Sequence, residues 1–235
     1  MRPVNLLFGS SLDGAPCPSN WMGPGRLVCG PEGLLNSLEV ALGLPPQVGI
    51  SEIERLISYR EAVEFGERLP WKGNPDPGTV GDAMHRIFAV EILNPESDEG
   101  TRLKRISDLL VGFNLESHLD PSEVAATVDR YRAFVKEQFS PISEQVEVPF
   151  SYLNELGQCV SGFIDHLLET AEGPVILDHK IFPGQREDWE AKALSYSGQL
   201  DAYVQALSEN GTIRCLIHLV TNGATLELMR EECAD

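Results

Sequence analysis

The sequence predicts an α/β (α+β) fold, in which a mixed central sheet is flanked by helices and follows an irregular helical N-terminal segment. Apolar residues recur at helical spacing between residues 81 and 139, and three apolar strand-like runs follow between residues 145 and 181. An Asn-Gly turn at residues 222–223 joins two further strand-like runs. This order of helices, strands, a helix and a strand pair is typical of a domain that packs helices against a sheet.

The first part of the chain is predicted to differ from the rest. Residues 1–78 form a Gly- and Pro-rich leader, and residues 79–235 form the main domain. Within the leader, the sequence predicts a short helix over 32–42 and a second over 51–66, which opens on a Ser-x-x-Glu capping box. We expect the leader to dock on a domain absent from this chain, an expectation that rests on its composition alone.

Three helices are predicted next, over residues 81–93, 102–111 and 121–139. The first has apolar residues at helical spacing and ends at an Asn-Pro pair. The third opens with Pro121 at its first helical position, where the missing N–H group is no loss.

Three strands are predicted over residues 145–153, 158–169 and 174–181. Side chains at i and i+2 of a strand share a face, so Asp178 and Lys180 project together. If the turn around residues 170–173 has an even number of loop residues, Asp165 lies opposite Asp178.

Two carboxylates this close repel each other unless a cation lies between them, and oxygen ligands suit Mg²⁺ or Mn²⁺ better than zinc. Acidic residues beside a hairpin also occur without any such role. The apolar run before Asp178 favours a metal site, because burying this carboxylate is costly without a compensating cation.

A long helix is predicted over residues 189–208, followed by strands over 213–220 and 225–229. Tyr196, Gln199 and Tyr203 share one face of that helix. Such a polar stripe could serve the site or form a half-buried aromatic seam.

The composition of the chain argues against several classes of protein. The formal charge of −18 disfavours unaided binding to nucleic acid, since that affinity rests largely on Lys and Arg. Five scattered cysteines with no Cys-x-x-Cys pair argue against a disulfide framework or a zinc knuckle. Apolar runs are too short for a membrane span or a signal peptide, so we expect a cytoplasmic protein with no membrane partner.

Taken together, these features resemble the RecB/AddA-type nucleases of the PD-(D/E)xK superfamily, as found at the C-terminus of UvrD-like bacterial helicases. The resemblance covers roughly residues 79–220. It rests on five pieces in order, namely Gly81 with His85, Glu147, Gly162 to Asp165, Ile176 to Lys180, and Gln199 to Tyr203.

The resemblance implies a metal site and a role for each residue. Asp165, Asp178, His85 and the backbone carbonyl of His179 would hold Mg²⁺ or Mn²⁺. Lys180 would orient or activate the attacking water and offset charge on the phosphate. Gln199 and Tyr203 would position Lys180, the water or the DNA. Glu147 would act behind the ligands or be an ordinary surface residue.

The implied function is a metal-dependent DNA nuclease, more an exonuclease than an endonuclease. It would act in DNA end processing, recombination or repair. A helicase motor, in cis or in trans, would feed it DNA strands, and the leader over residues 1–78 would dock on that motor. No iron-sulfur cluster is expected, because the closely spaced cysteine triad of some relatives is missing. Two other functions compete with this one. The first is a catalytically inactive nuclease-like scaffold that binds DNA ends or proteins, and the second is an unrelated Mg²⁺ hydrolase of small phosphate esters.

Overall fold

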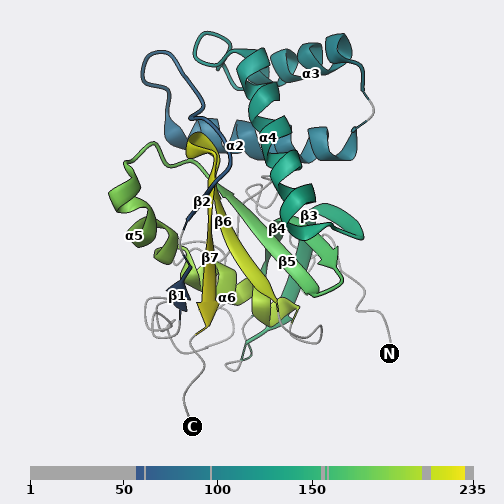
Figure 1. The fold of residues 1–235 in the computed structure, drawn as a ribbon, viewed down its shortest axis with the longest axis vertical. Helices are drawn as coiled ribbons and strands as arrows, with labels where there is room; N and C mark the ends of the chain where they lie inside the picture. The colour runs from purple at the N-terminus through teal and green to yellow at the C-terminus, as the bar shows by residue number, and fades with distance from the viewer. Residues whose placement is uncertain are drawn as a thin grey trace, which may run out of the picture.

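The computed structural model describes residues 57–60, 62–95, 97–154, 157, 159–207 and 213–230. Their centre is a mixed sheet of seven strands in the order β1-β7-β6-β5-β4-β3, with β2 also paired to β7 (Figure 1). Only β5 and β6 run parallel, and every other pair is antiparallel. The predicted mixed sheet with flanking helices is therefore confirmed.

Three helices precede the long strands of the sheet. They are α2 (Pro77–Leu93), α3 (Glu99–Gly112) and α4 (Pro121–Phe139). Each begins after an aspartate whose carboxylate accepts a hydrogen bond from a backbone N–H of the first turn. All three predicted helices are present, and α2 begins four residues before its predicted start because Asp76 caps it.

The predicted strands are also present, with ends that shift by one or two residues. The strands are β3 (Ser143–Leu153), β4 (Cys159–Thr170), β5 (Gly173–Lys180), β6 (Arg214–Leu219) and β7 (Ala224–Arg230). A two-residue turn joins β4 to β5, since Thr170 pairs with Gly173. A short 3₁₀ turn over Val220–Asn222 and Gly223, with φ of 60°, joins β6 to β7.

The helix predicted over residues 51–66 is wrong where the structure describes it. Strands β1 (Ile57–Tyr59) and β2 (Val63–Glu64) pair with β7 instead. The N–H groups of Phe65 and Gly66 also bond to the carbonyl of Gly223. The exposed edge of β7 offers these backbone groups hydrogen bonds that local helix propensity does not reveal.

These two strands place residues 57–59 and 63–64 in the same sheet as the main domain, although they precede the predicted boundary at residue 79. The helix predicted over 32–42 lies outside the described residues, as does the start of the one predicted over 51–66.

The long helix predicted over residues 189–208 is two helices. A 3₁₀ turn at Arg186–Asp188 leads into α5 (Trp189–Leu194), and α6 (Ser197–Ala206) follows after a break. At the break, the Ser195 hydroxyl bonds to the Lys192 carbonyl at 2.6 Å. A serine hydroxyl that bonds back to the helix competes with the regular backbone pattern. Tyr196 is consequently the N-cap residue of α6 rather than part of a continuous helix.

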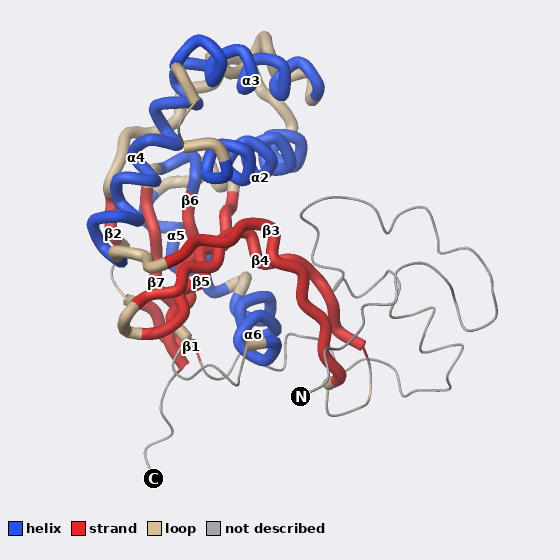
Figure 2. The backbone as a smooth tube through the Cα atoms, turned by 90° about the vertical axis from the view of Figure 1, so that its right-hand side faces the viewer, coloured by secondary structure: helices blue, strands red, loops and turns tan. Residues whose placement is uncertain are grey.

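Two apolar layers sandwich the sheet. One packs α2, α3 and α4 against side chains such as Leu177 and Leu216. The other packs α5 and α6 against side chains such as Ile176 and Ile217. Figure 2 shows α4 and α6 on opposite sides of the strands. Successive strand residues therefore alternate between a face covered by α2 to α4 and a face covered by α5 and α6.

Candidate active site

Three neighbouring strands each place one carboxylate at the same level of the sheet. In the β3–β4 pair, Val146 faces His166 and Val148 faces Ile164, so Glu147 lies opposite Asp165. In the β4–β5 pair, His166 faces Leu177, and the next position sets Asp165 beside Asp178. The two-residue turn thus produces the predicted neighbourhood of Asp165 and Asp178.

Glu147 has an unusual backbone conformation. Its φ is 51°, in the left-handed region that residues other than glycine rarely adopt. Such a conformation costs on the order of 1–2 kcal/mol and is held in place by surrounding contacts. Strained residues of this kind gather at functional sites, which supports a role for Glu147 in the site.

Asp165 is the most connected of the three carboxylates. Its side chain is nearly buried, and its Oδ2 accepts a 2.7 Å hydrogen bond from the backbone N–H of His179. Its Oδ1 lies 3.3 Å from Nδ1 of His85, which comes from α2. The tertiary fold therefore brings α2, β4 and β5 together at this one carboxylate.

The imidazole of His85 is oriented as in a metal ligand. Its Nε2 lies 2.7 Å from the carbonyl oxygen of His179, and its Nδ1 is buried with no hydrogen bond of good geometry. Ligand histidines usually donate one ring N–H to a carbonyl or carboxylate and coordinate through the other nitrogen. Nδ1 of His85 is therefore the candidate ligand atom. The His179 carbonyl, predicted to be a ligand itself, is engaged by His85 in this arrangement.

One ligand atom each from His85, Glu147 and Asp165 lies within 4.8 Å of the others. Within the described residues, this is the group of three that could hold a metal ion. A nitrogen with two carboxylates is a ligand set that suits a divalent cation, and the buried Nδ1 without a hydrogen bond shows that the residues present fit such an ion.

The charges of His85 and Asp165 depend on each other. Burial alone would lower the pKa of His85, but the facing carboxylate of Asp165 outweighs it and raises this pKa to about 9. Burial alone would raise the pKa of Asp165, but His85 and Lys180 outweigh it and hold this pKa well below its ordinary value. At neutral pH, without metal, the two form a buried ion pair.

Asp178 lies deepest in the site and is fully buried. Lys180 Nζ is 2.6 Å from its Oδ2. Burial, helped by the charge of Asp165, raises the pKa of Asp178 to about 6 in spite of the opposing effect of Lys180. Burial alone would lower the pKa of Lys180, but Asp178 and Asp165 raise it above its ordinary value. Lys180 is therefore protonated at neutral pH in this site.

Gln199 and Tyr203 of α6 hold the other oxygen of Asp178. The Gln199 amide donates to Oδ1 at 2.8 Å, and the Tyr203 hydroxyl donates to the same atom at 3.1 Å. The Gln199 amide also donates to the Tyr203 hydroxyl oxygen. These residues orient Asp178, and through it Lys180.

The opposite face of the sheet carries histidines on β4, β5 and β6. His166, His179 and His218 lie on the side covered by α2 and α4, and all three are buried. Nδ1 of His179 is 2.9 Å from Nδ1 of His218, and the Tyr131 hydroxyl hydrogen-bonds to Nδ1 of His166 at 2.7 Å. Burial lowers the pKa of His218 to about 3 and holds the pKa of His179 well below its ordinary value, so these two imidazoles are uncharged at neutral pH. His166 and His179 each follow a carboxylate residue in the same strand, so alternation along the strand turns their side chains away from Asp165 and Asp178.

The structure brings the predicted site residues together, but Glu147 rather than Asp178 joins the cluster of three candidate ligands. His85 and Asp165 join Glu147 in the three-residue cluster, while both oxygens of Asp178 face Lys180 or the α6 pair. The sequence left two roles open for Glu147, one behind the ligands and one as an ordinary surface residue. The alternation of Val146 and Val148 around Glu147 could have indicated its face, but not its left-handed φ.

Two further predictions concern the cysteines and membrane-spanning helices. Cys159 is exposed and Cys215 is buried, while Cys17, Cys29 and Cys233 lie outside the described residues. None of the helices in the described part of the chain has the length and apolar character of a membrane-crossing segment.

Comparison with known proteins places this geometry in a family. A search of curated proteins gave no match. Residues 59–230 match the PD-(D/E)XK nuclease superfamily, a match that begins within β1 and ends with the last residue of β7. Membership implies a metal-dependent nuclease that acts on DNA, in accord with the row of carboxylates, the histidine and the lysine described above. The chain belongs to the PD-(D/E)XK nuclease superfamily.

Proposed function

We propose that this chain is a Mg²⁺- or Mn²⁺-dependent deoxyribonuclease of the RecB/AddA type, and an exonuclease rather than an endonuclease. One observation carries the nuclease assignment. Three carboxylates from adjacent strands lie together with His85 from α2 and a protonated Lys180. Asp165 and Asp178 are buried, and the other side chains of the group are half-buried. Carboxylates alone would repel one another here, so the arrangement calls for a divalent cation.

Each side chain has a proposed task. Asp165, Glu147 and Nδ1 of His85 would hold the cation, with Asp178 beside them. A divalent cation bound there would lower the pKa of water and polarise the phosphodiester. Lys180 keeps its proton, so its task is to bind the phosphate and offset the charge that develops on it. Gln199 and Tyr203 keep Asp178 and Lys180 in place.

The wider role is proposed from charge and from the family resemblance. A chain with a formal charge of −18 has little long-range attraction for DNA. A UvrD/AddA-like helicase motor, in cis or in trans, would supply the affinity that this surface lacks and feed unwound strands to the site. DNA end processing in recombination or repair, in the cytoplasm, is the setting that we propose.

The test is a cleavage assay with end-labelled linear and circular DNA, single- and double-stranded, with Mg²⁺, with Mn²⁺ and with EDTA. We expect metal-dependent cleavage of linear DNA and resistance of circles, with loss of activity in Asp178→Ala and Lys180→Ala. Activity that survives both substitutions would refute the assignment, and rapid cutting of circles would replace the exonuclease by an endonuclease.

The rival function, an inactive scaffold, predicts a different pair of results. The wild-type protein would neither cleave any substrate nor bind Mn²⁺ in calorimetry, while DNA ends or a partner protein would still bind. Mn²⁺ binding that is abolished by Asp165→Ala would favour the nuclease even where the isolated chain cleaves slowly.

A further inference from the structure

Lys192 of α5 is a cation beside the active site with no anionic partner among the described residues. Its ammonium group makes cation–π contacts, with Nζ 4.8 Å from the Tyr196 ring centre and 5.9 Å from that of Phe182. Among the residues that the structure describes, no carboxylate forms an ion pair with it. By contrast, Lys180 is paired with Asp178 and Lys104 with Asp108. A half-buried lysine with an unneutralised charge is available to an anion from outside.

The ring of Tyr196 connects this lysine to the proposed catalytic lysine. Nζ of Lys180 lies 5.0 Å from the same ring centre, so both ammonium groups contact one aromatic side chain. Cations are attracted to the faces of aromatic rings, and this attraction holds the two lysines in neighbouring positions. Tyr196 itself is half-buried, and the break between α5 and α6 sets its orientation.

Phe182, the third member of this group, lies on a loop that is tightly anchored. The Thr221 hydroxyl bonds to both the N–H and the carbonyl of Phe182, at 3.3 Å and 2.8 Å. A Cβ on Gly184 would lie 2.2 Å from the Phe182 ring, so this glycine lets the ring lie across the loop backbone. The ring is half-buried and held in place before any ligand arrives.

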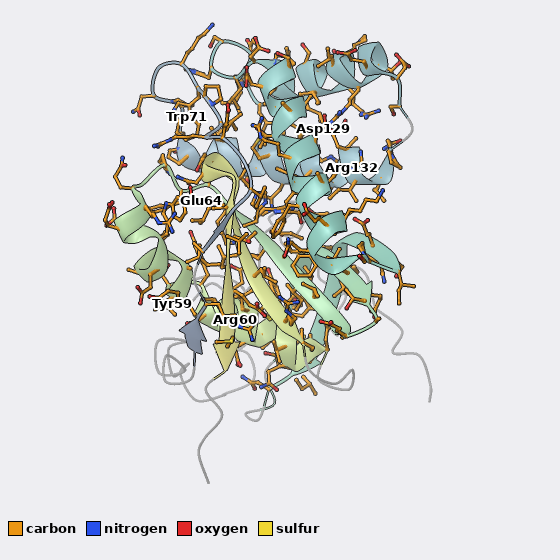
Figure 3. All side chains as sticks on the ribbon, in the orientation of Figure 1. Tyr59, Arg60, Glu64, Trp71, Asp129 and Arg132 are labelled. Carbon is orange, nitrogen blue, oxygen red and sulfur yellow. The ribbon has the colours of Figure 1, made fainter. Side chains whose placement is uncertain are left out.

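Acidic residues of the same segment do not neutralise Lys192. Glu190 lies close to Tyr59 of β1, and its carboxylate raises the pKa of that tyrosine. Figure 3 shows Tyr59 at the β1 end of the sheet. Glu187 and Asp188 are exposed on the 3₁₀ turn before α5.

We propose that Lys192, Tyr196 and Phe182 form a nucleotide subsite beside the cleavage site. Lys192 binds the phosphate next to the scissile one, and the two aromatic rings stack on an unpaired base. A cation together with aromatic faces is the combination that proteins use to hold single strands without sequence preference. The inference rests on the proposed nuclease function, and it names single-stranded DNA as the form that this side of the site takes.

Binding can be measured separately from cleavage. Fluorescence anisotropy with a labelled single-stranded oligonucleotide of about 20 nucleotides, in EDTA at several salt concentrations, gives an affinity and a salt slope. Loss of one phosphate contact lowers the salt slope by about 0.7 for a single strand. We expect that change in Lys192→Gln, with recovery in Lys192→Arg.

Lys104→Gln is the matched control, because it removes one exposed lysine charge from α3 and leaves the subsite intact. Phe182→Leu tests the stacking and should weaken single-strand binding about tenfold while changing blunt-duplex binding little. Thermal melting confirms that each variant is folded. The two Lys192 variants keep the test decisive should Phe182→Leu unfold.

The subsite is overturned if Lys192→Gln changes the salt slope no more than Lys104→Gln does, or if a folded Phe182→Leu weakens duplex and single-strand binding equally. These outcomes are distinct from failure of the proposed function. A wild-type protein that binds through Lys192 and never cleaves would retain the subsite and lose the nuclease assignment. A protein that cleaves DNA and whose salt slope does not change in Lys192→Gln would retain the nuclease assignment and lose the subsite.

Discussion

Glu147 lies opposite Asp165 across the β3–β4 pair and holds a left-handed φ of 51° at that point. Burial, together with the charge of Asp165, raises the pKa of Glu147. The chain thus places an anion in a strained conformation beside another anion. Both costs would be offset by a cation bound between the two carboxylates.

Substitution Glu147→Gln should therefore weaken metal binding. The amide keeps the size of the side chain but loses its charge, and we expect Mn²⁺ affinity to fall about tenfold or more, with a parallel loss of cleavage. Calorimetry with Mn²⁺ and a cleavage assay would measure the two effects. Unchanged Mn²⁺ affinity would return Glu147 to the supporting role that the sequence first indicated.

The backbone strain at Glu147 has a test of its own. Glycine adopts a positive φ without penalty, so Glu147→Gly should be more stable than Glu147→Ala by about 1 kcal/mol. The midpoints of denaturant unfolding of the two variants give this difference. Equal stabilities would mean that the left-handed conformation relaxes when the carboxylate is removed.

Lys180→Met should separate cation binding from catalysis. Removing an ammonium group 2.6 Å from Asp178 leaves the site more negative, so Mn²⁺ should bind at least as tightly as in the wild type. Cleavage should fall by about 100-fold or more, because the charge on the reacting phosphate is no longer offset. Single-turnover cleavage at saturating Mn²⁺ measures this loss. Weakened Mn²⁺ binding in a folded variant would instead assign Lys180 a structural task.

Metal affinity should rise with pH over a wide range. His85 has its pKa raised to about 9, so below that pH a proton must leave before Nδ1 can coordinate. Asp178 has its pKa raised to about 6, and below that pH a second proton competes. We expect the logarithm of the affinity to increase by about one per pH unit between 6 and 9, and more steeply below 6.

Calorimetry in buffers of different ionisation enthalpy measures the protons released on Mn²⁺ binding. About one proton per ion at pH 7.5 is the expected result. His85→Asn should bind more weakly and release none at that pH. Proton release that persists in His85→Asn would assign the proton to another group.

The helical layer depends on a buried carboxylate. Glu91 of α2 is 1% exposed and receives Arg102 and Arg105 of α3, each at 2.6 Å. Arg102 also contacts Asp129 of α4, which is labelled in Figure 3. Glu91→Ala leaves two arginines without their buried partner, and we expect a loss of about 3 kcal/mol in unfolding free energy.

The exposed pair Lys104–Asp108 on α3 is the control for this measurement. Asp108→Asn should change the free energy of unfolding by less than about 1 kcal/mol, since exposed pairs contribute little. Similar losses in both variants would show that the buried carboxylate does not connect the helices. Because α2 also carries His85, Glu91→Ala should weaken Mn²⁺ binding as well.

Local patterns account for what could be predicted from the sequence. The apolar runs and their period of two define strands β4 and β5, and a two-residue turn then aligns Asp165 with Asp178. Asp178 and Lys180 share a face for the same reason. His85 is different, because only the family resemblance placed a residue 80 positions before Asp165 in the same site.

Contacts between residues that are distant in the chain account for the features that the sequence did not predict. Residues 57–59 and 63–64 pair with the edge of β7, where the capping pattern predicted a helix. The contact of Ser195 with Lys192 divides one predicted helix into two, and the pairing of β3 with β4 gives Glu147 its neighbour.

The sequence alone therefore determined which strands carry the carboxylates and the lysine, since alternation along a strand is a local property. The tertiary structure alone decided that His85 faces Asp165, that Glu147 joins them, and that Lys192 stands without an anionic partner among the described residues. These relationships arise from packing between elements far apart in the chain, and no local pattern encodes such packing.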